Sequence, residues 1–233
     1  MGAIFVIMGH MLEWLGQNWL FMVAGAVVGM ILVKNYNKVD RLFHEKEWSD
    51  KGSAGERVLY NFLTNELGYP KSMIYRNLLI RDMSGKHAEI DMILLYRYGI
   101  VVFEVKNYSG EVFGEEKDKM WEHKVGGRIY QFYNPIMQNE KHIQVLRERL
   151  KDDRLKFYSV VIFGDRTIIR RMNYKAKNTW VGKVSGLRRV DEMIRGSSKM
   201  GIERGSDDAK RIKKFLRRAE RRRGEVLNDR KHK

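Results

Sequence analysis

The chain of 233 residues has a formal net charge of +16, with hydrophobic residues at 43% and charged residues at 32%. This composition excludes an intrinsically disordered protein, and the length allows one ordinary domain with additional segments. The absence of cysteine excludes a disulfide framework and a thiolate metal site. Residues 1–150 hold 19 Lys and Arg against 18 Asp and Glu, whereas residues 151–233 hold 26 against 11. The basic character therefore belongs to the C-terminal third.

An uncharged apolar segment, Leu15–Val33, lies near the N-terminus. As a helix its residues would span about 28 Å, close to the hydrocarbon thickness of a bilayer. Basic residues follow it (Lys34, Lys38 and Arg41) and none precedes it. The positive-inside rule therefore predicts a single-pass cell-membrane anchor, with the N-terminus outside and the following domain in the cytoplasm. A cleaved signal peptide and a buried helix are the alternatives. The Gly-x-x-x-Gly spacing at residues 25–29 also predicts a homo-oligomer through this helix.

The elements after a polar connector at residues 35–50 follow from apolar spacing. A helix is predicted over Ser53–Leu67, with an inward stripe of Val58, Leu59, Phe62, Leu63 and Leu67. Strands are predicted at Met73–Ile80, within 87–107, and at Glu111–Phe113, Lys119–Lys124, Phe157–Phe163, Ile168–Ile169 and Thr179–Val184. Gly126-Gly127 is predicted to begin a loop that runs to Asn134-Pro135. Further helices are predicted at Met137–Leu150, Arg189–Arg195 and Asp207–Arg223, with a linker at Ser197–Ser206.

The segment 87–107 contains charges within apolar strands. Two β-branched runs flank Arg97-Tyr98-Gly99 and predict a β-hairpin. The charged positions are Glu89, Asp91, Glu104 and Lys106. A two-residue loop at 97–98 would place Asp91 opposite Glu104, and a loop at 98–99 would place it opposite Lys106. In either register these three side chains share one face, whereas a three-residue loop without a bulge would separate Asp91 from them.

Two carboxylates and an ammonium on one face suit a hard divalent cation. Mg²⁺ prefers oxygen ligands and commonly takes one or two carboxylates with substrate phosphate oxygens. A bound metal lowers the pKa of water and stabilises charge on a phosphodiester. The structural alternative is a buried Asp–Lys pair. Because three charges share the face and Glu89 lies beside them, we favour the functional interpretation.

The same residues resemble a known family. Asp91, then twelve residues, then Glu104-x-Lys106 is similar to the core signature of the PD-(D/E)XK nuclease superfamily. The fuller pattern resembles the nuclease-related domain known as NERD, through Glu89-Ile-Asp91 and Gly99-Ile-x-Val-x-Glu104-Val-Lys106-Asn107. Further matching pieces are Gly52-x-x-Gly55-Glu56 upstream and Asn134-Pro-x-x-Gln138-Asn139 with His142 downstream. The resemblance covers roughly residues 50–165.

This resemblance implies an α/β fold with a restriction-endonuclease-like core, a mixed sheet flanked by helices. It also implies metal-dependent hydrolysis of nucleic acid, with DNA favoured over RNA. Asp91 and Glu104 would hold Mg²⁺ or Mn²⁺, and the Val105 carbonyl would be a further ligand. Lys106 would position the attacking water or stabilise the charge of the transition state.

Two further residues acquire roles from the resemblance. The carboxylate of Glu56 would reach the metal from its helix. The alternative is a structural role, because a carboxylate in the first turn also interacts favourably with the helix dipole. Gln138 would bind a substrate phosphate or the catalytic lysine, and its alternative is a solvent-facing helix end. His142 shares a face with Gln138. It is not assigned to the metal because no second histidine has ligand spacing with it.

The helix predicted at Asp207–Arg223 is basic and amphipathic. Its apolar side carries Ile212, Phe215, Leu216 and Ala219. The candidate nucleic-acid-binding residues on the rest of the helix are Lys210, Arg211, Lys214, Arg217 and Arg218. Such a helix could track phosphates through counterion release, lie on anionic lipid, or form a solvated tail.

The sequence therefore predicts a membrane-anchored, metal-dependent nuclease. The expected organisation is an apolar segment and transmembrane helix at 1–34, a connector at 35–50, the nuclease-like domain at 51–203 and a basic tail at 204–233. The alternative is a non-catalytic membrane-tethered module that binds nucleic acid or protein and retains the nuclease fold.

Overall fold

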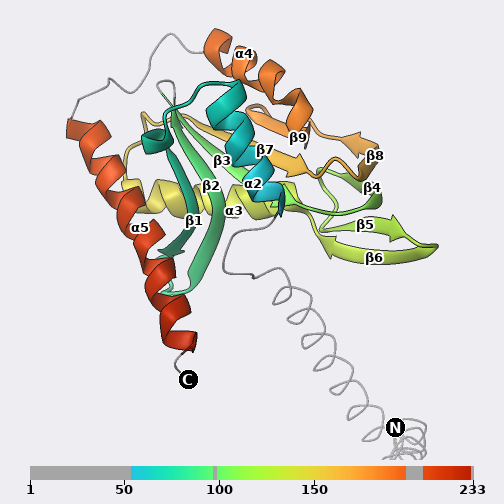
Figure 1. Ribbon diagram of the computed structural model, residues 1–233, viewed down its shortest axis with the longest axis horizontal. Helices are drawn as coiled ribbons and strands as arrows, with labels where there is room; N and C mark the ends of the chain where they lie inside the picture. The colour runs from blue at the N-terminus through green and yellow to red at the C-terminus, as the bar shows by residue number, and fades with distance from the viewer. Residues whose placement is uncertain (1–53, 97–98, 198–206, 232–233) are drawn as a thin grey trace, which may run out of the picture. The chain divides into compact units, whose positions relative to one another are not determined.

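The computed structural model describes residues 54–96, 99–197 and 207–231 (Figure 1). The predicted membrane helix, the connector and most of the predicted linker lie outside these ranges. Among the helices of these ranges, none combines the length and the apolar composition that a membrane span requires.

A mixed five-stranded sheet forms the centre of the fold. In spatial order it contains β1 (Ile74–Arg81), β2 (His87–Tyr96), β3 (Gly99–Lys106), β7 (Phe157–Phe163) and β9 (Thr179–Lys183). The first three strands pair antiparallel, whereas β7 is parallel to both β3 and β9. All seven residues of β7 are buried, which confirms the central position predicted from its charge-free sequence.

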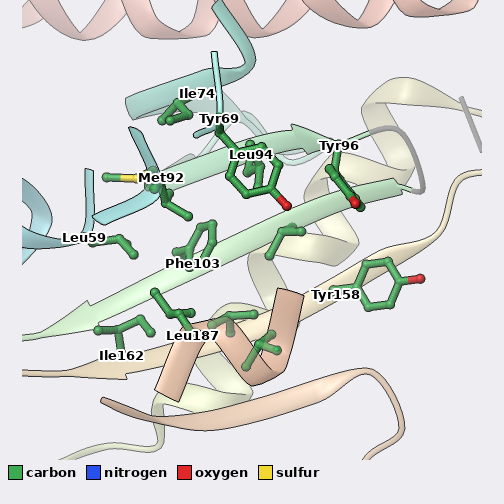
Figure 2. Close-up of a cluster of buried hydrophobic side chains, with 14 of the residues drawn as sticks. Leu59, Tyr69, Ile74, Met92, Leu94, Tyr96, Phe103, Tyr158, Ile162 and Leu187 are labelled. Atoms are coloured by element: carbon green, nitrogen blue, oxygen red, sulfur yellow. The ribbon is translucent and has the colours of Figure 1, made fainter. Parts of the chain in front are cut away.

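Helices cover both faces of this sheet. One face packs against α2 (Ala54–Asn61), η1 (Phe62–Glu66) and α4 (Leu187–Ser197). Figure 2 shows this core, where Leu59, Phe103 and Leu187 come together from three different elements. The opposite face packs against α3 (Pro135–Leu150) and α5 (Asp207–Lys231). The short helices η2 (Lys71–Met73) and η3 (Val184–Gly186) connect these elements.

A second, four-stranded sheet extends from the end of β3. Its order is β6 (Arg128–Tyr133), β5 (Met120–Val125), β4 (Gly110–Glu115) and β8 (Thr167–Asn173). The side chain of Trp121 in β5 is fully buried. A Cβ at Gly114 would lie 2.2 Å from the Trp121 ring, so only glycine leaves room for it. Two sheets flanked by helices fit the predicted restriction-endonuclease-like core.

The structure selects one of the predicted hairpin registers. Tyr96 pairs with Gly99, so the loop between β2 and β3 has two residues, 97–98. This is the register that places Asp91 across from Glu104.

Three details of the sequence prediction are wrong. Gly126-Gly127 begins a tight turn into β6, not a loop, because both glycines adopt positive φ and the chain reverses at once to pair with β5. Val58 is 47% exposed and does not belong to the inward stripe of α2. The predicted regular helix also changes from an α-helix (Ala54–Asn61) to a π-helix (Phe62–Glu66), which rotates the later side chains relative to a regular helix.

A candidate active site of buried acids and lysine

Glu104 and Lys106 form a buried ion pair near the end of β3. They are two residues apart, so their side chains leave the strand on the same face. Lys106 Nζ lies 2.8 Å from Glu104 Oε1, and the two residues are only 6% and 2% exposed. Charged residues are seldom buried this deeply unless they are paired.

Asp91 lies where both neighbouring strand pairings are interrupted. The β1–β2 register omits Asn77 and Asp91, and the β2–β3 pairing starts only at Met92 with Phe103. Asn77 has a φ of 54°, in the left-handed region. The Asp91 side chain instead bridges to β3, because its Oδ2 accepts a hydrogen bond of 2.8 Å from Val105 N. This bond fixes the Asp91 carboxylate beside the end of β3, and the residue itself is half-buried.

Helix α3 supplies the side chains that face the ion pair. The helix begins at an Asn134 cap, whose side chain accepts a hydrogen bond from Ile136 N at 2.9 Å. One turn later, Lys106 Nζ donates to Gln138 Oε1 at 3.2 Å. His142 Nε2 lies 3.3 Å from Glu104 Oε2, without hydrogen-bond geometry. The lysine therefore has two acceptors, one from β3 and one from α3.

The ionisation of these groups is strongly coupled. Burial raises the pKa of Asp91 well above its usual value, and the negative charge of Glu104 raises it further. Burial acts in the same direction on Glu104, but Lys106 and His142 outweigh it and lower the pKa of that carboxyl. Burial alone would lower the pKa of Lys106, yet Glu104 raises it above its usual value. The site therefore holds a stable Glu104–Lys106 ion pair and an aspartate that retains its proton unusually well.

Glu56 extends the cluster from the other side of the sheet. It lies in the first turn of α2 and is half-buried. Its negative charge contributes to the raised pKa of Asp91, so the two carboxyl groups are close enough to interact. The role of Glu56 as a metal ligand stays a prediction.

The donor set fits a divalent cation. Glu104 Oε2 is buried and accepts no hydrogen bond from the residues that the structure describes. A cation between Glu104 and Asp91 would satisfy this oxygen and replace the proton on Asp91. Across residues 54–96, 99–197 and 207–231, no three Asp, Glu, His or Cys side chains gather closely enough to hold a metal by themselves. The fit therefore relies on two carboxylates, with main-chain, water and substrate oxygens completing the coordination.

Sequence reasoning left Asn139 without a role. Asn139 is fully buried, and its Nδ2 donates to Val102 O and Ser159 Oγ, both at 2.9 Å. These hydrogen bonds connect α3 to β3 and β7. They therefore fix the position of the helix, and with it the positions of Gln138 and His142 relative to Glu104 and Lys106. The sequence contains a pattern that could have predicted the burial of Asn139, because Asn139, His142 and Leu146 have the i, i+3, i+7 spacing of a buried helix face.

The basic helix α5 is part of the domain. Ile212, Leu216 and Ala219 are buried against the central sheet, and Figure 1 shows α5 beside β1. The alternative of a solvated tail is therefore wrong for the described part of α5, whereas contact of its basic side with anionic lipid or with nucleic acid stays a prediction. Two of the candidate nucleic-acid-binding residues already have protein partners. Arg211 donates to Leu150 O at 2.8 Å, and Lys210 pairs with Asp207 at 3.0 Å.

The other basic candidates on α5 are exposed. They are Lys214, Arg217 and Arg218, and Arg221 and Arg222 continue the exposed surface along the helix. The exposed side of α5 from Lys214 to Arg222 is thus predominantly cationic.

Comparison with known proteins agrees with the resemblance seen in the sequence. Residues 51–164 match the family model described as the nuclease-related domain, NERD. An uncharacterized protein of Bacillus anthracis is 30% identical over 138 residues, which cover 59% of this chain. The match covers 63% of that relative, less than two thirds of its length.

Proposed function

We propose, from the nuclease-related domain at residues 51–164, that this protein hydrolyses phosphodiester bonds of nucleic acid, with DNA favoured over RNA. The observation that carries the proposal is the buried constellation of Asp91, Glu104 and Lys106 at one end of β3. A structural ion pair needs only one acid for one lysine. The additional aspartate, held beside the pair with a raised pKa, adds a repulsion that a cation would relieve.

The proposed cofactor is Mg²⁺ or Mn²⁺, held by Asp91, Glu104 and the Val105 carbonyl, with Glu56 in support. When bound, the ion lowers the pKa of water and offsets negative charge on the phosphodiester. Glu104 has one oxygen committed to Lys106 and the other available, so it can keep the lysine in place while it holds the ion.

Lys106 is the proposed group that orients the attacking water or stabilises charge on the scissile phosphate. Its raised pKa keeps it cationic at neutral pH, so it acts through its charge and its hydrogen bonds and not as a base. Gln138 holds the ammonium from the α3 side at 3.2 Å and limits its orientation. Gln138 is therefore proposed as a residue that positions the lysine.

We further propose that the exposed basic face of α5 contacts the phosphate backbone. The apolar side of α5 is occupied by the sheet, which favours a polyanion over an inserted membrane surface as the partner of the free side. The predicted anchor at Leu15–Val33 remains part of the proposal and would hold the domain at the cytoplasmic side of the cell membrane, with Gly-x-x-x-Gly pairing as its route to a homo-oligomer.

The test uses the full chain in detergent with linear DNA, circular DNA and RNA, in Mg²⁺, Mn²⁺ or EDTA. Cleavage should require the metal and should be lost in Asp91→Asn and Lys106→Ala. Lys156→Ala serves as the matched control, because Lys156 is exposed and precedes β7 at the opposite end of the sheet. Equal cleavage by all four proteins would refute the assignment. Binding without cleavage would instead support a tethered binding module, the second candidate, which the cationic face of α5 favours.

A further inference from the structure

A row of aromatic rings leads from the candidate active site to the surface of the β5–β6 hairpin. The rings of Tyr108 and His123 stack with centroids 4.8 Å apart and planes 14° from parallel. His123 and Tyr130 follow at 6.2 Å, with planes 35° apart. Tyr108 and His123 are half-buried, whereas Tyr130 is 39% exposed. The row therefore becomes more accessible with distance from the core.

The inner end of the row lies next to Lys106. Tyr108 follows Lys106 by two residues in the chain, and its hydroxyl contributes to the raised pKa of that lysine. His123 Nε2 hydrogen-bonds to the carbonyl of Ser109, in the connection between β3 and β4. Phe132 supports Tyr108 by an edge contact at 4.9 Å. These contacts hold the hairpin in a fixed position beside the end of β3.

The outer end of the row lies on an edge strand with positive surroundings. β6 pairs with β5 alone, and the hairpin extends away from the central sheet (Figure 1). Residues 119–133 contain three Lys or Arg and one Glu. The basic residues Lys119, Lys124 and Arg128 are all exposed. Arg128 lies two residues from Tyr130 on the same face of β6, whereas Lys124 pairs with Ile129 and lies on the opposite face. An exposed aromatic ring on the same face as the cationic Arg128 suits a ligand that has flat rings and negative charge.

We infer that the β5–β6 hairpin stacks the unpaired bases of a single-stranded nucleic acid beside the candidate active site. In a duplex both faces of each base are covered by neighbouring bases, so only unpaired bases can stack on a side chain. Arg128, on the same face as Tyr130, would contact the phosphates between those bases. The inference rests on the proposed function and names its substrate class: single strands, overhangs or frayed ends, not continuous duplex.

The test measures binding without cleavage. Full-length protein in detergent and EDTA is titrated with fluorescent oligothymidine and with a blunt duplex of equal length. The wild type should bind the single strand more tightly than the duplex. Tyr130→Ala should weaken single-strand binding about five- to hundredfold, the range of one lost base-stacking contact, and leave duplex binding unchanged. Tyr130→Phe should retain the affinity, because the ring and not the hydroxyl makes the contact.

Ile129→Ala is the matched control. Ile129 is 62% exposed and lies next to Tyr130 on the same edge strand, but its side chain points to the opposite face of the sheet. Loss of affinity in Ile129→Ala equal to that in Tyr130→Ala would overturn the inference. So would an equal effect of Tyr130→Ala on single strand and duplex, no effect on either, or no preference of the wild type for the single strand.

The two proposals can fail separately. If cleavage is absent but binding depends on the Tyr130 ring, the hairpin assignment stands and the nuclease assignment falls. If metal-dependent cleavage occurs and Tyr130→Ala binds like the wild type, the nuclease assignment stands and the hairpin assignment falls.

Discussion

Two substitutions at Asp91 separate its structural role from its electrostatic one. Its Oδ2 accepts the hydrogen bond from Val105 N, and its charge opposes that of Glu104. Asp91→Asn keeps the acceptor oxygen and the side-chain volume but removes the charge. Asp91→Ala removes both. The difference between the two variants therefore isolates the hydrogen bond.

The magnitude follows from the burial of the donor. Val105 is 8% exposed, so its N–H in the alanine variant would lose its partner in a largely water-free place. An unsatisfied buried donor costs about 1–3 kcal/mol, and Asp91→Asn should exceed Asp91→Ala in unfolding free energy by that amount. For a domain of this size about 1 kcal/mol corresponds to about 2–4 °C in Tm, which predicts a difference of about 2–12 °C.

The negative charge of Asp91 lowers the stability of the folded protein, whereas its hydrogen bond to Val105 raises it. Because the pKa of Asp91 is raised in the folded state, the folded protein holds this proton more tightly than the unfolded chain does. The stability of the metal-free wild type therefore falls as the pH rises from the ordinary aspartate pKa through the raised one. Asp91→Asn cannot ionise and should be more stable than the wild type above that range, with no gain below it.

The assay is thermal unfolding of the full chain in EDTA, followed by circular dichroism across a pH series. Neither variant should be stabilised by Mn²⁺, because both lack the carboxylate. Equal stability of Asp91→Asn and Asp91→Ala would refute the role of the hydrogen bond. A wild type that gains stability over the asparagine variant as the pH rises would refute the electrostatic argument.

Four further outcomes are expected. Lys106→Ala leaves the buried carboxylate of Glu104 without its ion-pair partner and should lower the unfolding free energy by about 3–5 kcal/mol at neutral pH, with partial recovery when Glu104→Gln is added. Mg²⁺ should raise the Tm of the wild type more at about pH 8 than at about pH 5, because it competes with the proton on Asp91. Gln138→Ala removes an acceptor of the lysine and should slow cleavage about tenfold at little cost in Tm, since about 1.4 kcal/mol of lost positioning suffices. Lys214→Gln should reduce the slope of log affinity against log salt for duplex DNA by about 0.9, with unchanged unfolding, because Lys214 is exposed.

The sequence predicted the central hairpin because its signals were local. Two apolar, β-branched runs defined both strands, and the two-residue loop at 97–98 was one of the two registers that put the charged residues on one face. The shared face of Glu104 and Lys106 then required only the period of a strand. Gln138 and His142 belong to the family pattern and indicated that their helix would face Glu104 and Lys106. They did not indicate which side-chain atoms would be in contact.

The sequence did not predict β6 or the packing of α5, because both depend on distant partners. Residues 128–131 of β6 are all exposed, so no buried face produced an alternating pattern. Its strand conformation comes from pairing with β5. Likewise, Ile212 and Leu216 formed a visible apolar stripe on α5, but a stripe does not say whether lipid, solvent or a sheet will cover it.

The position of Asp91 explains why the candidate site opens at this point of the sheet. A residue in the middle of a three-stranded ladder would ordinarily pair through its main chain on both sides, and its side chain would stay in the packed face. Here Ile90 and Ile93 lie in the same core cluster although they are three residues apart, which shows that β2 is distorted between them. Tyr75 and Leu78 show the same shift on β1, around the left-handed Asn77. The register places Asp91 across from Glu104, and the two facing distortions leave its main chain outside both ladders, so that its carboxylate accepts the Val105 N–H of β3 beside the proposed cation site.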